Sequence, residues 1–446
     1  MSGSRPGLLK YRINMKLIFL KDANYDRERQ ALCARTPVPR EIEEQVRQIV
    51  AEVAARGDKA ISEFLEKFDG VKLSPARFRV TEQEIREAEK QILPRERKAI
   101  MLALRHIREF ASRTKPKSWT FRPRPGVVLG EQFRPMERVA CYVPGGTAPL
   151  VSTAVHTVGV AKAAGVPSVA AMTPPMKNGK INPKTLFALH AAGADEIWKM
   201  GGAYAVAALA FGTKTIRKAE LIAGPGNAYV AAAKKLLYGQ TAVDMVAGPS
   251  EIMVIADKRA NPAFAAADIL SQAEHGSGLE RAFLASDDAD FLKKAKEEIL
   301  SQAETLKRQG PLRKVLENGV ALIQVRDMND AAELAGEYAP EHLEIQCARP
   351  ERLAKKIRAA GAIFLGDWTP EPAGDFTAGP SHVLPTGGTA KFFHGLTCSD
   401  FMRRSSLLHY TKEALRREIW AMETMAELEG LDAHARSATI RRRKGS

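Results

Sequence analysis

Two neighbouring side chains, Glu341 and His342, have the chemistry to move protons near neutral pH. They lie in the segment Tyr-Ala-Pro-Glu-His-Leu-Glu at residues 338–344, where Pro340 restricts the backbone that leads to them. Carboxylates and imidazoles are frequent general acids and bases in enzymes. The pair therefore predicts a site of proton transfer.

Side chains that could bind a metal occur elsewhere in a chain that has only 9 histidines. Gln272 and His275 are three residues apart near the end of a predicted helix that Gly276 would terminate, so both side chains leave one face. Asp375 and His434 could complete a mixed nitrogen and oxygen site suited to zinc. A surface or core pairing of Gln272 with His275 and a turn role for Asp375 are the alternatives. Spacing alone does not show that the four residues converge.

Three glycine-rich junctions between a strand and a helix could lie against a nucleotide phosphate. They are Pro144-Gly-Gly-Thr147, Met200-Gly-Gly-Ala203 and Gly224-Pro-Gly-Asn227. Glycine lets a backbone approach a ligand closely, and helix N-termini attract anions. None of the three matches the Gly-x-Gly-x-x-Gly fingerprint or a P-loop, and each alone could be a plain turn. His382 also lies in a loop, where functional and idle histidines are equally expected.

The composition is that of an ordinary globular protein, with 45% hydrophobic and 27% charged residues. No apolar run approaches the ~20 residues needed to cross a bilayer, and the first residues lack the apolar core of a secretory signal. The 4 cysteines are far apart and indicate neither a zinc ribbon nor a disulfide framework. We therefore expect a cytoplasmic protein of roughly three domain-sized units without a membrane segment.

The net charge of +15 could attract nucleic acid or an anionic cofactor. Basic residues are scattered along helical stretches such as 95–113, and only residues 441–444 form a run. No helix-turn-helix, zinc-finger or aromatic-basic RNA motif accompanies them. An anionic cofactor is thus the better interpretation, and no nucleic-acid partner is expected.

The elements that must position these residues begin with helices. Apolar residues recur at three- and four-residue steps from Arg40 to Phe68 with an interruption at Gly57, which predicts two amphipathic helices. A second helical block opens with a capping box formed by Thr81 and Glu84 and ends near residue 115.

From Val139 onward, short apolar strands alternate with helical stretches, which is typical of a parallel sheet flanked by helices. The expected strands are Val139–Val143, Ser168–Met172, Glu196–Met200 and Glu220–Ala223, followed by Glu251–Ala256, Arg281–Ser286, Val320–Val325, Leu343–Gln346 and Ala362–Leu365. The predicted fold class is α/β, with two Rossmann-like parallel-sheet units, an N-terminal helical segment and a C-terminal helical tail. That tail needs a partner surface on its own chain or on a second copy.

Six motifs follow one another along the chain. They are Tyr142-Val-Pro-Gly-Gly-Thr-Ala-Pro-Leu150, Gly224-Pro-Gly-Asn227, Asp244-Met-Val-Ala-Gly-Pro-Ser-Glu251, Leu270-Ser-Gln-Ala-Glu-His-Gly276, Tyr338-Ala-Pro-Glu-His-Leu-Glu344 and His382-Val-Leu-Pro-Thr386. In type and order these motifs resemble those of histidinol dehydrogenases, over nearly the whole chain. The resemblance implies an enzyme that oxidises L-histidinol through L-histidinaldehyde to L-histidine with two NAD, the last step of histidine biosynthesis.

The resemblance also implies roles for individual residues. His342 would be the general base and Glu341 the group that activates water. One Zn²⁺ per subunit would be bound by Gln272, His275 and Asp375 of one subunit and His434 of the other, in a homodimer with a shared active site. L-histidinol would be surrounded by Ser250, Gln272, His275, His342, Asp375, Glu429 and His434. NAD would be contacted by Tyr142, Tyr204 and Asn227.

The predicted domain organisation has four parts. Residues 1–37 form an N-terminal segment, and residues 138–250 form an α/β domain with the NAD-binding turns. Residues 38–137 and 251–396 form a larger α/β domain that carries the catalytic pair and most metal ligands. Residues 397–446 form a helical tail that crosses to the partner subunit.

Two departures from the family pattern keep a second enzyme function open. Tyr204 stands where the family usually has glutamine, and residues 391–394 replace a stretch that is more often rich in serine. A homologous zinc- and NAD-dependent dehydrogenase of another small polar alcohol, such as a diol or an amino alcohol, is the alternative. Retention of the inferred metal ligands and Glu429 favours histidinol. The intact Glu341–His342 pair argues against a basic binding protein that has lost catalysis.

Overall fold

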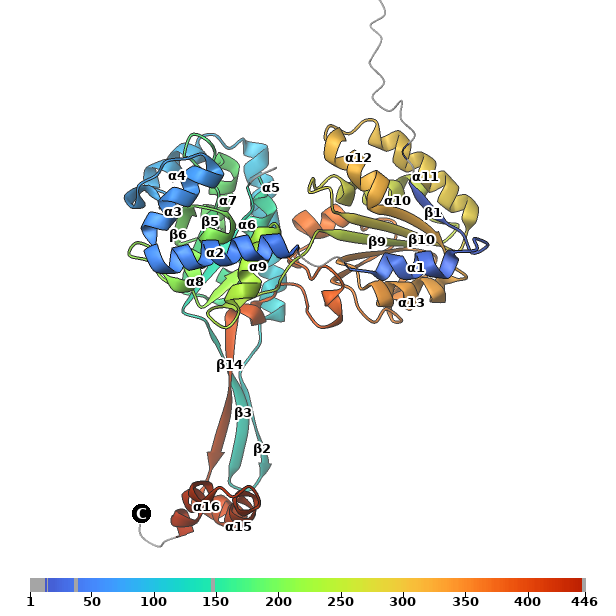
Figure 1. Ribbon diagram of the computed structural model, residues 1–446. Coiled ribbons are helices and arrows are strands. Elements are labelled where there is room, and N and C mark those ends of the chain that lie inside the picture. The colour runs from blue at the N-terminus through green and yellow to red at the C-terminus, as the bar shows by residue number, and fades with distance from the viewer. Residues whose placement is uncertain (1–12, 14, 36–38, 146–148, 443–446) are drawn as a thin grey trace, which may run out of the picture. The chain divides into compact units, whose positions relative to one another are not determined.

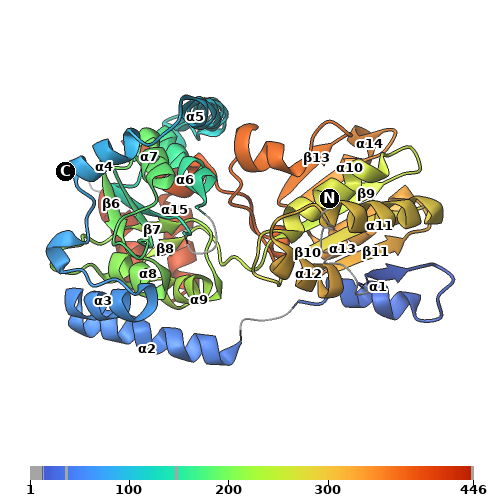
Figure 2. The same ribbon diagram turned by 90° about the horizontal axis from the view of Figure 1, so that it is seen from above.

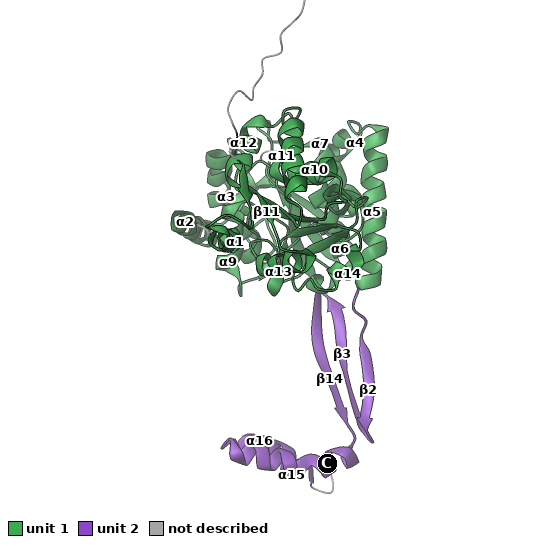
Figure 3. Cartoon of the chain, turned by 90° about the vertical axis from the view of Figure 1, so that its right-hand side faces the viewer, with its two compact units in different colours: residues 1–114, 136–401 green, residues 115–135, 402–446 purple. Residues whose placement is uncertain are grey.

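The computed structural model describes residues 13, 15–35, 39–145 and 149–442, which divide into two compact units (Figure 3). Unit 1 consists of residues 1–114 and 136–401, and unit 2 of residues 115–135 and 402–446. Part of the predicted turn Pro144–Thr147 lies outside the described residues, because residues 146–148 are not among them. Within the described ranges, none of the helices has the length and apolar character of a membrane span.

Unit 1 contains a six-stranded parallel sheet. Its strands are β1 (Lys16–Ile18), β9 (Glu251–Ala256), β10 (Arg281–Ser286), β11 (Val320–Gln324), β12 (His342–Gln346) and β13 (Ala362–Leu365), in the spatial order β1-β11-β10-β9-β12-β13. One face is covered by α10 (Pro262–Ala273), α11 (Ala289–Ala303) and α12 (Gln309–Asn318), and the other by α1 (Tyr25–Cys33), α13 (Met328–Tyr338) and α14 (Pro350–Ala354) (Figures 1 and 2). Successive strand residues such as Ile252 and Met253 therefore enter two separate cores.

Unit 1 also contains a five-stranded parallel sheet. Its strands are β4 (Arg138–Tyr142), β5 (Ser168–Thr173), β6 (Glu196–Lys199), β7 (Leu221–Ala223) and β8 (Ala242–Val243), in the order β6-β5-β4-β7-β8. Helices α8 (Gly202–Phe211) and α9 (Ala228–Leu237) lie between one face and α2 (Arg40–Arg56), while α6 (Val151–Ala164) and α7 (Pro183–Ala192) belong to the other. Every strand predicted from the sequence is present, with ends that shift by at most one residue. The predicted α/β class with two parallel-sheet units is confirmed.

The helices before residue 115 also form as the sequence predicts. Helix α2 ends at Gly57, whose φ is 53°, and α3 (Asp58–Phe64) follows directly and leads into a π-helical turn, η1 (Leu65–Asp69). Helix α4 (Glu82–Glu89) has the capping box of Thr81 with Glu84, and α5 (Pro94–Thr114) follows it.

The contacts of these helices differ from the predicted domain grouping, which joined residues 38–137 to residues 251–396. Helix α2 packs on α8 and α9, α4 on α7, and α5 on α6, all of which flank the five-stranded sheet. Helical periodicity reveals an apolar face but does not reveal which sheet will cover it, and for that reason the grouping could not be read from the sequence.

Unit 2 is built around an antiparallel sheet that the sequence did not predict. Strands β2 (Trp119–Arg124), β3 (Val127–Pro135) and β14 (Met402–Tyr410) lie in the order β14-β3-β2, and α15 (Lys412–Leu428) and α16 (Asp432–Thr439) follow β14. The helical part of the predicted tail is therefore confirmed, but a nine-residue strand precedes it. Seven of the nine residues of β14 are exposed, so the strand lacks the alternation of buried and exposed side chains by which a strand is recognised in a sequence.

One stabilising contact of unit 1 gives a prediction for its acid stability. Asp330 is 3% exposed at the start of α13 and bonds Arg29 at 2.6 Å and Arg326 at 3.0 Å. Burial opposes ionisation, but the hydrogen bonds from Arg326 and Arg29 outweigh it and lower the pKa of Asp330 to about 2. Because this pKa lies below the value of 3.8 in an unfolded chain, the carboxylate stabilises the fold above that pH, and the contribution is lost as the pH falls toward 2.

We expect Asp330→Asn to lower the free energy of unfolding by about 1.5–3 kcal/mol at pH 7, the range for a hydrogen bond to a charged group. Urea unfolding at pH 7 and pH 3 measures the effect, which should be smaller at pH 3. Asp290→Asn is the matched control, because the Asp290 side chain is 78% exposed in its pair with Lys293. Equal losses in the two variants would contradict the prediction.

Candidate active site

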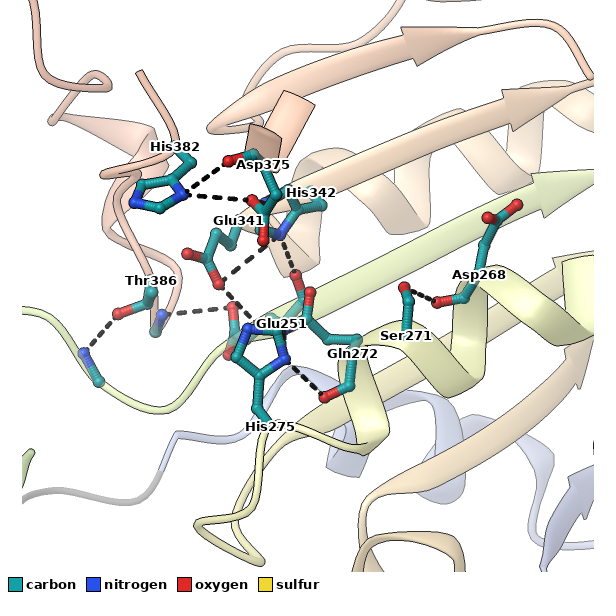
Figure 4. A network of polar contacts seen from close by, with 12 residues as sticks. Glu251, Asp268, Ser271, Gln272, His275, Glu341, His342, Asp375, His382 and Thr386 are labelled. Atoms are coloured by element: carbon teal, nitrogen blue, oxygen red, sulfur yellow. Dashed lines mark hydrogen bonds and ion pairs between the residues drawn. The ribbon is translucent and has the colours of Figure 1, made fainter. Parts of the chain in front are cut away.

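The predicted acid–base pair lies at the amino end of β12, in the six-stranded sheet (Figure 4). Glu341 is 6% exposed and His342 is 3% exposed. The backbone of Glu251, on the neighbouring strand β9, holds both: its N–H donates to Glu341 Oε2 at 2.8 Å, and its carbonyl lies 3.0 Å from His342 Nδ1. A carbonyl can only accept, so Nδ1 carries a hydrogen and Nε2 is the nitrogen that can take up a proton.

The electrostatic surroundings of the pair favour its protonated forms. Burial raises the pKa of Glu341 to about 8. Burial alone would lower the pKa of His342, but the negative charges of Glu341, Asp375 and Glu371 outweigh it and raise that pKa to about 10. Positive charge bound beside these carboxylates would oppose the shift and lower the pKa of His342. The site is therefore suited to a cationic ligand or substrate.

Asp375 faces His342 from a π-helical turn, η3 (Ala373–Thr377). Its Oδ1 lies 3.5 Å from His342 Nε2 and 3.9 Å from His382 Nδ1. Burial opposes ionisation of Asp375, but its close pairing with His342 and the charge of His382 outweigh burial and lower its pKa. Glu371 is 2% exposed, and ligand atoms of His342, Glu371 and Asp375 all lie within 4.8 Å of one another.

Gln272 and His275 lie at the end of α10, which returns to the amino edge of the sheet after β9 (Figure 4). Gln272 is fully buried, and its Nε2 lies 3.2 Å from His275 Nδ1. Among the described residues, Gln272 Oε1 and His342 Nε2 are buried acceptors without a hydrogen-bond partner. Helix α10 ends at Ala273 with Glu274 as its C-cap, so Gly276, whose φ is 102°, lies in the turn beyond the helix and does not cap it as predicted. Unsatisfied buried acceptors beside an ionised carboxylate fit a bound metal ion.

Of the residues assigned to cofactor binding, Tyr142, Tyr204 and Asn227 all lie at the carboxyl edge of the five-stranded sheet or just beyond it. The hydroxyl of Tyr142 accepts the N–H of Gly202 at 3.1 Å, and that of Tyr204 accepts the N–H of Gly201 at 3.2 Å. The crevice outside the carboxyl ends of parallel strands is the usual place for a nucleotide.

Tyr204 directly follows the glycine-rich turn at residues 200–203, and Asn227 is the last residue of the turn at residues 224–227. The Tyr204 hydroxyl donates to Asp69 Oδ2 at 2.5 Å, so its hydrogen and its acceptor are both used within the protein. Asn227 caps α9, with Oδ1 accepting the N–H groups of Tyr229 and Val230 at 3.1 and 3.2 Å. Its side chain is exposed, which leaves the amide nitrogen facing solvent or a ligand.

The remaining assigned residues fall in two places. Ser250 directly precedes Glu251 and is half-buried, so it belongs to the same strand end as the acid–base pair. Glu429 and His434 belong to unit 2, where both line one groove between α15 and α16 together with Met425 and Ser437. The structure thus groups Ser250, Gln272, His275, Glu341, His342 and Asp375 in unit 1, and Glu429 with His434 in unit 2.

Three residues of this site were not assigned from the sequence. Glu371 lies four residues before Asp375 in the same proline-rich segment, and that spacing could have suggested it. Glu251 acts through its backbone, which no residue pattern reveals. His382 was left open as a loop histidine, and its Nδ1 lies 3.1 Å from the carbonyl oxygen of Asp375.

Comparisons with known proteins identify the family of this chain. Residues 34–442 match the family model described as histidinol dehydrogenase. The chain is 43% identical over 428 residues to a histidinol dehydrogenase of Syntrophotalea carbinolica, covering 96% of this chain and 99% of that protein. It is 44% identical over 401 residues to one of Listeria monocytogenes, covering 90% and 93%. The crystal structure of histidinol dehydrogenase from Elizabethkingia anophelis is similar with a TM-score of 0.91 and 33% identity, over 97% of this chain and 98% of that one.

Proposed function

Because this chain belongs to the histidinol dehydrogenase family, we propose that Glu341 and His342 carry the acid–base chemistry of an NAD-dependent oxidation of L-histidinol. The enzyme converts L-histidinol through L-histidinaldehyde to L-histidine with two NAD, in histidine biosynthesis. The observation that supports the roles of the two residues is the buried pair itself: the Glu251 carbonyl accepts the Nδ1 hydrogen of His342, so His342 exchanges a proton with the substrate at Nε2.

In the first oxidation, His342 Nε2 would take the proton of the alcohol hydroxyl, and NAD would accept the hydride from the alcohol carbon. In the second oxidation, Glu341 would take a proton from the water molecule that adds to the aldehyde. Once His342 has released the first proton, it would take the hydroxyl proton of the hydrate, and a second NAD would accept the hydride. NAD supplies the redox chemistry, and the chain's own residues orient the carbon and move the protons.

For the family's zinc ion, Gln272, His275 and Asp375 offer oxygen and nitrogen ligands, and the unpartnered Gln272 Oε1 supports their assignment. We propose His434 of the partner subunit as the remaining ligand. Bound zinc would orient the imidazole and amine of histidinol. Ser250 and Glu429 would complete the substrate site. Glu371 offers a further carboxylate, because its ligand oxygen lies within 4.8 Å of the ligand atoms of Asp375 and His342.

A homodimer with a shared active site is the proposed assembly. It is supported by the large apolar side chains that unit 2 leaves exposed. Leu408 is 67% exposed, Trp420 67% and Leu428 77%. Large apolar side chains that are this exposed in one unit are costly in water and are frequent at protein interfaces. A second copy of the chain would cover it and bring the groove of Glu429 and His434 to the partner's active site.

For NAD, we propose binding at the turns that carry Tyr142, Tyr204 and Asn227. The amide of Asn227 is available for direct contact. Tyr204 replaces the glutamine usual in the family and uses its hydroxyl internally. It would therefore act through its ring and through the Gly201–Gly202 backbone rather than through a hydroxyl contact to the cofactor.

Glu341→Gln should mainly impair the second oxidation. Glutamine keeps the acceptor oxygen for the Glu251 N–H but cannot take a proton from water. We expect the rate of histidinaldehyde oxidation to fall by ~10² or more, while hydride transfer from histidinol changes much less. Single-turnover measurements with each substrate separate the two steps. Equal losses in both would contradict the assignment of Glu341.

The function is tested by NADH formation from L-histidinol with the zinc-loaded protein, together with identification of the product. Two NADH per histidine formed would support the double oxidation. No turnover with histidinol, but NADH formation from other diols or amino alcohols, would instead support the alternative dehydrogenase.

A further inference from the structure

A buried ion pair between Lys234 and Asp244 lies outside the catalytic cluster, and no step above uses it. The side chains are 2% and 1% exposed. Lys234 comes from α9, and Asp244 directly follows β8. Removing two charges from water is costly, and apolar side chains of similar size would often serve stability as well. The contacts of the pair therefore indicate what it does.

Both charged groups act on the backbone of one residue, Gly224. Lys234 Nζ donates to the Gly224 carbonyl at 2.9 Å, and the Gly224 N–H donates to Asp244 Oδ2 at 2.7 Å. The φ of Gly224 is 116°, and a Cβ there would lie 2.2 Å from the carbonyl oxygen of Tyr142. The pair thus fixes the first residue of the Gly224–Asn227 turn against the end of β4.

The same pair is connected through a short segment to the catalytic residues. Asp244 Oδ1 accepts the N–H of Met245 at 2.7 Å, at the start of the segment that leads to β9. Within that segment, the Gly248 N–H donates to Thr386 Oγ1. The segment ends at Glu251, whose backbone holds both Glu341 and His342. One run of eight residues, 244–251, therefore links the turn to the acid–base pair.

We propose that Lys234 and Asp244 are positioning residues that fix the Gly224–Asn227 turn for NAD and hold it in register with the catalytic pair. This proposal rests on the proposed role of that turn in cofactor binding. Hydride transfer requires the donor carbon and the acceptor ring to be held close together, and a small displacement is costly. The pair itself contacts the Gly224 backbone and the N–H of Met245, and the hydrogen bonds described for the pair do not include the metal ligands.

The test replaces both charges with apolar side chains in the full-length, zinc-loaded enzyme. Lys234→Met with Asp244→Leu removes the two contacts to Gly224 without leaving an unpaired buried charge. The matched control is Arg138→Met with Glu196→Leu. That pair is also buried, with 4% and 15% exposure and a 2.7 Å contact, but it joins the amino ends of β4 and β6, the edge opposite Tyr142.

Calorimetric titration with NAD is the first measurement. We expect the Lys234/Asp244 double variant to bind NAD about tenfold to a hundredfold more weakly, with zinc content within about twofold of the parent. The Arg138/Glu196 double variant should bind NAD like the parent. Similar NAD affinity in the two double variants would overturn the proposal, because a purely structural pair would not separate them.

Asn227→Ala separates this proposal from the one on which it rests. Weaker NAD binding in Asn227→Ala but not in the Lys234/Asp244 double variant would overturn the positioning role alone. Unchanged binding in both would overturn the assignment of the turn as well. If the double variant does not fold, Lys234→Met takes its place in the same titration. It removes the donor to the Gly224 carbonyl, and parental NAD affinity in that variant would overturn the proposal.

Discussion

Replacing His342 by asparagine is expected to lower kcat by ~10² to 10⁴ for both oxidations, the usual contribution of a general base. The nitrogen that would accept the proton, Nε2, is buried and without a hydrogen-bond partner among the described residues. Asparagine can still donate to the carbonyl of Glu251, the contact that His342 Nδ1 makes at 3.0 Å. The variant should therefore keep the local fold and lose only the proton acceptor.

Steady-state rates with histidinol and with histidinaldehyde, at saturating NAD, measure this effect. Zinc content and thermal unfolding should stay close to those of the parent. His190→Asn is the control, because His190 lies on α7 with a 45% exposed side chain and plays no part in the site. If the His342→Asn enzyme keeps more than about a tenth of the parental rate in either step, His342 is not the general base of that step.

Much of the fold could be predicted because its signals are local. The capping box of Thr81 and Glu84 and the break at Gly57 each depend on a few neighbouring residues. The buried strands of the two parallel sheets read as short apolar runs, since both of their faces are covered. Strand β14 gave no such signal, because most of its side chains are exposed and its partner β3 lies over 260 residues away.

The residues of the candidate site were predictable from the sequence, but the contacts that hold them in place were not. Glu341, His342, Gln272, His275 and Asp375 are unusual by chemistry and motif, so the sequence alone indicated them. The supports act at long range or through the backbone. Glu251 holds the catalytic pair with its N–H and carbonyl across 90 residues of chain, and Lys234 with Asp244 holds the backbone of Gly224. Such contacts depend on how distant strands come together, and no spacing along the chain encodes them.

Mixing two inactive variants is expected to restore activity if the active site is shared between subunits. Gln272→Ala removes a proposed ligand in unit 1, and His434→Asn removes one in unit 2. Each homodimer should have lost nearly all zinc-dependent activity, because every site lacks one ligand, and loss of a ligand leaves the substrate's imidazole and amine without their anchor. The two variants are then unfolded together, mixed in equal amounts and refolded with zinc.

Random pairing would make about half of the dimers mixed, and each mixed dimer would contain one site with both parental residues and one with neither. Specific activity should therefore return to about a quarter of the parental value, with zinc content rising in step. A site built within one subunit predicts no recovery, since every site would still carry one of the two substitutions. Mixing Gln272→Ala with Asp375→Asn is the control, because both residues come from unit 1. If Gln272 and Asp375 of one subunit bind the same zinc ion, every active site in that mixture lacks one of the two ligands. Recovery of activity there would contradict the proposed arrangement.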